Sequence, residues 1–304
     1  MFWIPAHKTA GMTYLCVACV RLSNYNPLQA PDKRLLKGRL GPDTICIYCL
    51  SWYNNVVMKE QIQLGTWREE GLSLLLKEAS GIDEPGERID FLSKHFLDTP
   101  YKDLTLIGDK HTAEVLVINI EEVDCFTFIE YIEAMRRSKS FNEFREHLIK
   151  VRYRSGHIAF EHRNHFFTDW KVFHSGFVVD VTEDIGSGRS RKVNKRLNQK
   201  QDGTVFLPGI SCRQREVTYL QSVSLDESVM EKLNTGDYIG IYSGDDGLDV
   251  SHVGILIKNK HSLRLRHASS LKKYRKVVDE DFKEYLEGKP GMIVLRPKDS
   301  SPSP

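Results

Sequence analysis

One cysteine and two histidines are the residues of this chain most able to do covalent chemistry. Cys125 follows Asp124 at the start of a helical pattern, while His252 and His267 lie in two later segments with strand patterns. A thiol becomes a useful nucleophile when a helix N-terminus or a neighbouring imidazole favours the thiolate. The combination therefore predicts a cysteine hydrolase.

The residues around the cysteine specify how it would be presented. Asp124 is a suitable N-cap, which leaves Cys125 in the first helical turn. Free backbone N–H groups and the positive end of the helix dipole would favour the thiolate there, and the same groups could stabilise an oxyanion. The alternative is an inert core cysteine among Phe126, Phe128 and Ile129. The histidines shift the balance towards catalysis.

The two histidines are expected to meet across a β-hairpin. A two-residue turn that pairs Lys258 with His261 places His252 opposite His267. Directly opposed side chains lie about 5 Å apart at Cβ, so one imidazole could orient the other. His252 would then be the base for Cys125. Two opposed histidines could instead bind a metal, but no third ligand is evident nearby.

The other cysteines suggest a separate N-terminal module. Four of them form two CxxC pairs with 26 residues between the pairs: Cys16, Cys19, Cys46 and Cys49. Such pairs commonly present four thiolates to a structural zinc ion, so a small zinc-binding module is one interpretation of this segment. Four buried cysteines, or two disulfides in an exported chain, remain alternatives. Cys212 stands alone.

Composition limits the class of protein. The chain has 304 residues, of which 40% are hydrophobic, and a formal net charge of +2. This length can bury one substantial core, and near-neutrality argues against a dedicated nucleic-acid binder. The apolar run at residues 10–20 is about half the length of a membrane span, and it lacks the flanks of a clear signal peptide. The compartment stays open.

The order of the patterns predicts an α+β fold. Helical patterns cover residues 67–79, 85–96, 124–135 and 141–151, and strand patterns cover 114–120, 238–242, 252–257, 263–267 and 292–295. With most helices first and an antiparallel meander later, the nucleophile helix would pack across the sheet. The basic stretch 184–203 is expected to be a solvated loop. The predicted organisation is an N-terminal extension (1–57), a catalytic domain (58–297) and a disordered tail (298–304).

Several stretches together resemble a known group of enzymes. Residues 123–130, 236–238, 251–255 and 267–270 resemble the papain-like NlpC-type cell-wall hydrolases. The resemblance is closer to their N-acetylmuramoyl-L-alanine amidase-like branch, with support from residues 96–101, 153–156, 161–170 and 290–297. Asp98 departs from the pattern, which usually has glycine before Thr-Pro-Tyr.

The resemblance implies a papain-like NlpC-type fold and a reaction. A cysteine amidase of this kind cuts between N-acetylmuramic acid and L-alanine in peptidoglycan fragments, without a catalytic cofactor and outside the cytoplasm. By motif match, Cys125 would be the nucleophile, His252 the general base and His267 the orienting residue, with Tyr101 near the oxyanion. A stem-peptide endopeptidase and a non-catalytic muropeptide-binding protein are the alternatives.

A polar cluster is the candidate substrate wall. Arg163 could bind a carboxylate, Asn164 and Asp169 could bind hydroxyls or amides, and Trp170 could stack on a sugar. The same residues could instead form a buried, hydrogen-bonded corner that positions a loop. The sequence leaves both roles open.

Overall fold

The computed structural model describes residues 60–298. The predicted N-terminal extension and almost all of the predicted tail therefore lie outside the described residues. The four cysteines of the CxxC pairs lie there too, so the zinc site and its alternatives stay predictions, as does the domain boundary.

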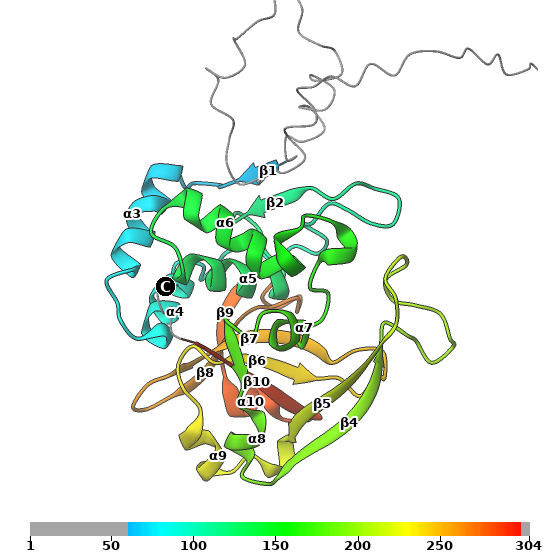
Figure 1. The fold of residues 1–304 in the computed structure, drawn as a ribbon. Coiled ribbons are helices and arrows are strands. Elements are labelled where there is room, and N and C mark those ends of the chain that lie inside the picture. The colour runs from blue at the N-terminus through cyan, green and yellow to red at the C-terminus, as the bar shows by residue number, and fades with distance from the viewer. Residues whose placement is uncertain (1–59, 299–304) are drawn as a thin grey trace, which may run out of the picture. The chain divides into compact units, whose positions relative to one another are not determined.

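The described chain alternates short helices with strands (Figure 1). The helices are α3 (Glu69–Ala79), α4 (Pro85–Lys94), α5 (Cys125–Arg136), α6 (Phe141–Arg152), α7 (Asp169–Phe173), α8 (Thr182–Gly186), α9 (Glu227–Lys232) and α10 (Phe282–Leu286). The strands are β1 (Glu60–Gln63), β2 (Leu116–Asn119), β3 (Val178–Asp180), β4 (Ser190–Leu197), β5 (Arg213–Gln221), β6 (Tyr238–Tyr242), β7 (Val250–Lys258), β8 (Leu263–Ala268), β9 (Val277–Asp281) and β10 (Gly291–Pro297).

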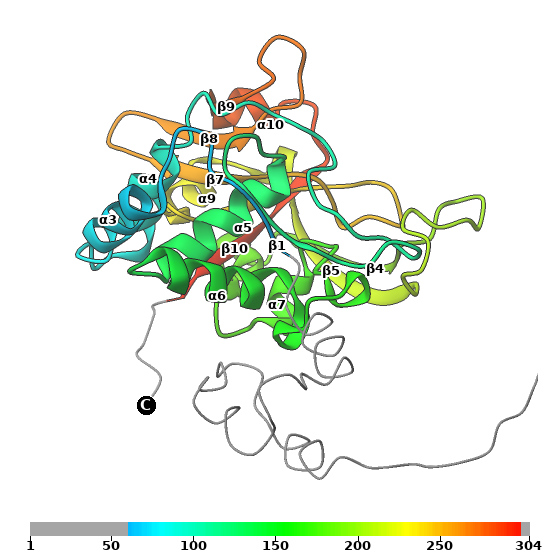
Figure 2. The same cartoon turned by 90° about the horizontal axis from the view of Figure 1, so that it is seen from above.

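An antiparallel sheet organises the described part of the chain. Its strand order is β4-β5-β10-β6-β7-β8-β9, with β3 also paired to β10, while β1 and β2 form a short parallel pair of their own. Helices α3 to α6 gather on one side of the sheet, and α8 to α10 lie on the other (Figures 1 and 2). The predicted mixed α/β architecture with an antiparallel sheet is confirmed.

Each face of the sheet buries its own apolar cluster. On β7, Val253 and Ile255 pack in the cluster that contains Phe128 of α5, whereas Leu256 packs in the cluster that contains Phe282 of α10. Alternate residues of a strand point to opposite faces, so a continuous apolar run marks a strand covered on both sides. This arrangement fixes α5 against β7.

Helix α5 begins at a reciprocal cap. The Asp124 carboxylate accepts hydrogen bonds from the N–H groups of Phe126 and Thr127, at 2.9 and 2.7 Å, and the Thr127 hydroxyl accepts one from the Asp124 N–H. Such a capping box satisfies backbone donors that a helix start leaves free. The predicted N-cap is confirmed, and it leaves Cys125 as the first helical residue.

The basic stretch 184–203 is not a loop throughout. Within it, β4 pairs along its full length with β5. Lys195 and Leu197 are buried on the inner face, where the Lys195 ammonium donates to the carbonyls of Ser243 and Asp245. The prediction of a solvated loop was wrong because a lysine occupies an inward position and hides the alternation of the strand.

The hairpin that carries the histidines has a longer turn than expected. Lys258 pairs with Leu263, not with His261, because residues 259–262 form a four-residue loop closed by the Asn259 N–H to Ser262 carbonyl bond of 2.9 Å. The register is therefore shifted by two positions. A shift of two keeps every side chain on its predicted face. His252 thus lies diagonally from His267 on the same face of the sheet rather than directly opposite it.

Candidate active site

Cys125 lies where the start of α5 meets β7. The residue is half-buried. Backbone N–H groups of Val253, Cys125 and Phe126 act on its sulfur and lower the pKa of the thiol. Val253 directly follows His252 on β7, so the sulfur lies against the strand that carries the candidate base. The packing of α5 on the sheet therefore brings Cys125 to the backbone of the residue that follows His252.

The surroundings of Cys125 raise the pKa of its thiol, whereas the sequence predicted a lowered pKa. Burial raises the pKa of Cys125 to about 12, and the neighbouring Asp124 carboxylate adds to the rise, while the backbone N–H groups offset only part of it. The expectation that the helix start favours the thiolate is therefore corrected. The N-cap residue itself contributes the opposing charge. At neutral pH the resting sulfur is a protonated thiol.

The two histidines form a hydrogen-bonded pair despite the shifted register. His252 Nε2 lies 2.8 Å from His267 Nδ1, and the two rings are perpendicular with centroids 4.8 Å apart. Gly254 leaves the space beside the pair, since a Cβ at this position would lie 3.0 Å from the Cβ of His267. Burial lowers the pKa of His252 to about 3 and that of His267 to about 4. Both imidazoles are therefore neutral at neutral pH.

Two residues beside the pair were missed from the sequence. His267 Nε2 lies 2.9 Å from Oε1 of Glu280 on β9, and the ring of Tyr285 on α10 lies edge-on to His267 with centroids 4.9 Å apart. Strand β9 was not predicted. Val277 and Val278 are a strand signal, but the three acidic residues that follow them hid it.

Tyr101 lies on a segment that runs beside the start of α5. It forms a parallel bridge with Val123, two residues before Cys125. Its hydroxyl donates a hydrogen bond of 2.6 Å to Asp103. Burial and the Asp103 carboxylate raise the pKa of Tyr101, and the charge that Cys125 would carry as a thiolate adds to the rise. The phenol is therefore neutral, and it is close enough to interact electrostatically with a thiolate at Cys125. Its present partner is Asp103.

The backbone conformation at Asp98 accounts for the glycine that the family pattern usually has at this position. The Asp98 φ of 68° lies in the left-handed region that glycine adopts most easily and that aspartate tolerates. Lys276 also reaches its carboxylate at 2.6 Å. The departure from the family pattern therefore preserves the turn that carries Tyr101.

The polar cluster predicted as a substrate wall lies on α7 and the segment before it, and its side chains mostly contact other parts of the protein. The half-buried Arg163 is held by Glu114 through two bonds of 2.9 and 2.6 Å. Asp169 is fully buried and receives Arg215 at 2.9 Å. The guanidinium of Arg163 and the carboxylate of Asp169 are thus already occupied by partners within the protein.

The remaining two members of the cluster are buried as well. The amide of Asn164 donates to the Val151 carbonyl at 2.8 Å, and Trp170 packs edge-on against Tyr238 with centroids 5.2 Å apart. Both side chains are about 2% exposed. These contacts favour the alternative of a buried corner over a substrate wall for Asn164, Asp169 and Trp170, because a ligand could not reach them without moving the core.

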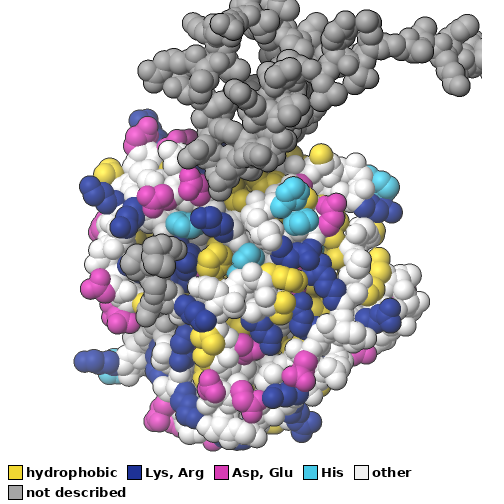
Figure 3. Space-filling view, in the orientation of Figure 1, with side chains coloured by type: hydrophobic (Ala, Val, Ile, Leu, Met, Phe, Trp, Pro, Cys, Tyr) yellow, Lys and Arg dark blue, Asp and Glu magenta, His cyan; other side chains and the backbone are white. Residues whose placement is uncertain are grey.

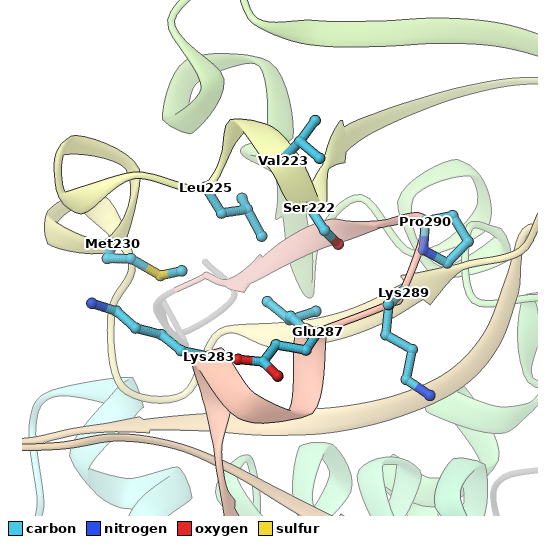
Figure 4. A pocket seen from close by; sticks show the side chains of 10 residues that line it. Ser222, Val223, Leu225, Met230, Lys283, Glu287, Lys289 and Pro290 are labelled. Carbon is cyan, nitrogen blue, oxygen red and sulfur yellow. The ribbon is translucent and has the colours of Figure 1, made fainter.

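A separate hollow lies on another face of α10. A cavity of about 500 Å³ is lined by Leu225, Met230, Lys283, Glu287 and Lys289, among others (Figure 4). It includes neither Cys125 nor the histidines. Lys289 links the two places, because its ammonium lies 5.4 Å from the ring centroid of Tyr285.

Within residues 60–298, no cluster of three or more His, Cys, Asp or Glu side chains is arranged to hold a metal. None of the helices described there is long and apolar enough to cross a membrane. On the face drawn in Figure 3, acidic and basic side chains are interspersed, in keeping with the small net charge of the chain.

Comparison with models of known families identifies the family of the chain. The model of the AmiA-like family, described as N-acetylmuramoyl-L-alanine amidase-like, matches residues 91–292. The chain belongs to this family. The match spans Cys125, both histidines and Glu280, and it begins after the N-terminal extension.

Solved structures of amidase-like proteins share the fold. An N-acetylmuramoyl-L-alanine amidase from Bacteroides uniformis is 30% identical, with 71% of this chain and 99% of that chain covered and a TM-score of 0.59. A Legionella pneumophila protein of family DUF1460 is 21% identical, with 75% and 94% covered and a TM-score of 0.63, and it supports the fold alone.

One further relative has a different name. A Bacteroides fragilis protein with the provisional name of a xylanase is 31% identical, with 67% of this chain and 98% of that chain covered and a TM-score of 0.54. No curated protein matches the chain. Membership of the amidase-like family therefore supports a hydrolase that acts on peptidoglycan-related substrates, and the bond it cleaves has to be argued from the site.

Proposed function

We propose that the protein is a cysteine amidase that hydrolyses the bond between N-acetylmuramic acid and L-alanine in peptidoglycan fragments. The observation that carries this proposal is a hydrogen-bonded pair of neutral histidines whose strand, β7, also contacts through the Val253 N–H a thiol at a helix start. The Bacteroides uniformis relative is named for this activity. We further propose that the fold is of the papain-like NlpC type, with the nucleophile helix packed on the antiparallel sheet.

The roles follow from which ring nitrogens are free. His252 uses Nε2 for His267, so Nδ1 is the nitrogen left to receive the Cys125 proton. As the sulfur attacks the lactyl carbonyl carbon, His252 Nδ1 takes the thiol proton and then delivers it to the departing nitrogen of L-alanine. The products of this step are a thioester on Cys125 and a free L-alanyl peptide.

The second half of the reaction restores the enzyme. Water attacks the thioester carbonyl, His252 accepts a proton from that water, and the sulfur leaves and takes the proton back. The lactyl group departs as a carboxylic acid. In both halves the carbonyl oxygen becomes negative, and the Cys125 N–H is the backbone donor that we propose for it, since the N–H groups of Phe126 and Thr127 already donate to Asp124. The Tyr101 hydroxyl would assist if it turned from Asp103 towards the site.

In the resting protein the Cys125 thiol and the His252 imidazole are both neutral, so they do not form a thiolate–imidazolium ion pair. The thiol has a raised pKa and His252 a lowered one, so proton transfer must accompany the attack on the carbonyl rather than precede it. General-base catalysis of this kind contributes about a hundredfold to ten-thousandfold in rate.

The test is product analysis with one purified muropeptide that carries an intact stem peptide. Wild-type protein should release the L-alanyl peptide, identified by its mass, and Cys125→Ala should abolish that release. Cys212→Ala is the matched control, because this second half-buried cysteine is not placed at the histidine pair. Full activity of Cys125→Ala would overturn the mechanism. Cleavage within the peptide would identify a stem-peptide endopeptidase, and no cleavage by wild-type protein would leave a binding protein.

A further inference from the structure

A carboxylate extends the histidine pair into a chain of three hydrogen-bonded side chains. Glu280 Oε1 lies 2.9 Å from His267 Nε2, and His267 Nδ1 lies 2.8 Å from His252 Nε2. Glu280 comes from β9, His267 from β8 and His252 from β7. The register places Leu265 opposite Glu280 and His267 opposite Val278. Glu280 and His267 are therefore diagonal neighbours on one face of the sheet.

The chemistry of a carboxylate determines the direction of this chain. An ionised carboxylate only accepts hydrogen bonds, so His267 must donate from Nε2. A neutral imidazole carries one N–H, so His267 Nδ1 then accepts and His252 must donate from Nε2. The lone pair of His252 is thereby placed on Nδ1, the nitrogen that the proposed reaction needs as its base.

We propose that Glu280 is a positioning residue that fixes the tautomers of both histidines. The inference rests on the proposed function for its kinetic consequence, but the proton positions follow from the geometry alone. Without the carboxylate, the pair can also bond in the opposite direction. His252 would then carry its proton on Nδ1 and present an N–H instead of a lone pair to the thiol.

The charged and titratable groups around Glu280 leave its Oε1 available to accept a hydrogen bond from His267. Lys273 lies 3.6 Å from its second oxygen, Oε2, so Oε1 is left to His267. The neighbouring acid, Asp279, is held by Arg266 through two bonds of 2.8 and 2.9 Å. The other such groups that act on the histidines or on the Glu280 charge are Tyr285, on α10, and Lys289, which precedes β10.

Glu280 would also act as the reaction proceeds. When His252 accepts the thiol proton, it becomes an imidazolium in a half-buried site. The chain of hydrogen bonds places the Glu280 carboxylate at the far end of the pair, where its negative charge opposes the cost of that new positive charge. Both effects concern the reacting state, so they should change kcat more than KM.

The decisive variant is Glu280→Gln, which preserves size while removing the charge. Its amide can donate to His267 Nε2 and so stabilise the reversed tautomers. We expect kcat to fall about tenfold to a hundredfold with KM little changed, the range seen for carboxylates that orient metal-bound imidazoles. The matched control is Glu284→Gln, the same change at an exposed position on α10, which should leave kcat unchanged. Glu280→Ala should fall at least as far as Glu280→Gln.

A second readout does not depend on any substrate. Nitrogen NMR of protein labelled at histidine should show the proton of His252 and of His267 on Nε2 in the wild type and redistributed towards Nδ1 in Glu280→Gln. Unchanged proton positions together with an unchanged kcat in Glu280→Gln would overturn the proposal. If wild-type protein does not cleave the muropeptide but the proton positions move, the positioning role stands and the proposed amidase function fails.

Discussion

Two hydrogen-bonded polar regions of this protein differ in how far their polar groups are paired within the protein. The first, here called the histidine edge, consists of Cys125, His252, His267 and Glu280, and the second, the buried corner, contains Asn164, Asp169 and Trp170. In the corner, Asp169 is fully buried against Arg215, and the amide of Asn164 binds the Val151 carbonyl. At the edge, Glu280, His267 and His252 form a chain of hydrogen bonds that ends at His252, on the strand whose backbone contacts the half-buried Cys125.

The difference shows how a structural polar network can be distinguished from a reactive one. The corner pairs full charges, which is the condition for burying them. The edge consists of neutral imidazoles that leave one ring nitrogen of His252 without a partner in the chain of bonds, on the strand whose Val253 N–H acts on a thiol of raised pKa. A network with an open end and a path to solvent can pass a proton to a substrate, and a saturated one cannot.

The largest effects should come from one substitution in each region. His252→Ala should lower kcat about a thousandfold with little change in the free energy of unfolding, since it removes the proposed general base from a half-buried position. Asp169→Asn should cost about 3 kcal/mol of stability, because it leaves buried Arg215 without its carboxylate, while kcat per folded molecule changes much less. Urea unfolding and product assays on both variants test this. The reverse pattern would refute the assignment of the two regions.

Acid should weaken both regions through their histidines. Burial lowers the pKa of His252 to about 3 at the edge and that of His174 to about 4 beside the corner. Below the ordinary pKa of 6.5 the unfolded chain binds protons that the folded chain does not, so stability should fall as the pH drops from about 6.5 to about 4. Each such histidine contributes a slope of up to about 1.4 kcal/mol per pH unit.

Single replacements would show where that acid sensitivity arises. His252→Gln and His174→Gln should each make the urea midpoint less dependent on pH between 7 and 5 than it is in the wild type. An unchanged pH dependence in both variants would mean that other buried groups, such as His147 and His165, whose pKa values are also lowered, account for the effect.

The smallest effect should come from a charge at the boundary of the edge. The ammonium of Lys289 lowers the pKa of both His252 and His267. Lys289→Met should therefore raise both pKa values by a few tenths of a unit, as expected for a partly screened charge. An NMR titration of the histidine rings would detect this shift, and a shift in the opposite direction would contradict the placement of Lys289 beside Tyr285.

The sequence was sufficient where local rules determine structure. The Asp124 cap, the helix after it and the strands that carry the two histidines follow from short patterns. The hairpin register did not, because a four-residue turn cannot be distinguished from a two-residue turn when Asn259 suits both. The direction of the Cys125 pKa depended on burial, which only tertiary packing supplies.

The role of Glu280, and the choice between a substrate wall and a buried corner, were beyond sequence reasoning for related reasons. Glu280 lies in an acidic strand whose pairing with β8 is a long-range property. Arg163 and Asp169 look like ligand-binding residues in isolation, and their partners, Glu114 and Arg215, are distant in the chain. Residue type indicates which groups can carry a charge, whereas the partner determines whether that charge is still available.

The backbone N–H groups of Val253, Cys125 and Phe126 that act on the sulfur have a consequence for how the site depends on packing. These donors come from α5 and from β7, and they belong to the main chain, so no exchange of side chains can remove them directly. Their alignment lasts only while the helix stays docked on the strand. A substitution that loosens the packing of α5 on β7 would therefore weaken the lowering effect of the Val253 N–H on the pKa of the thiol, even with every side chain of the histidine edge unchanged.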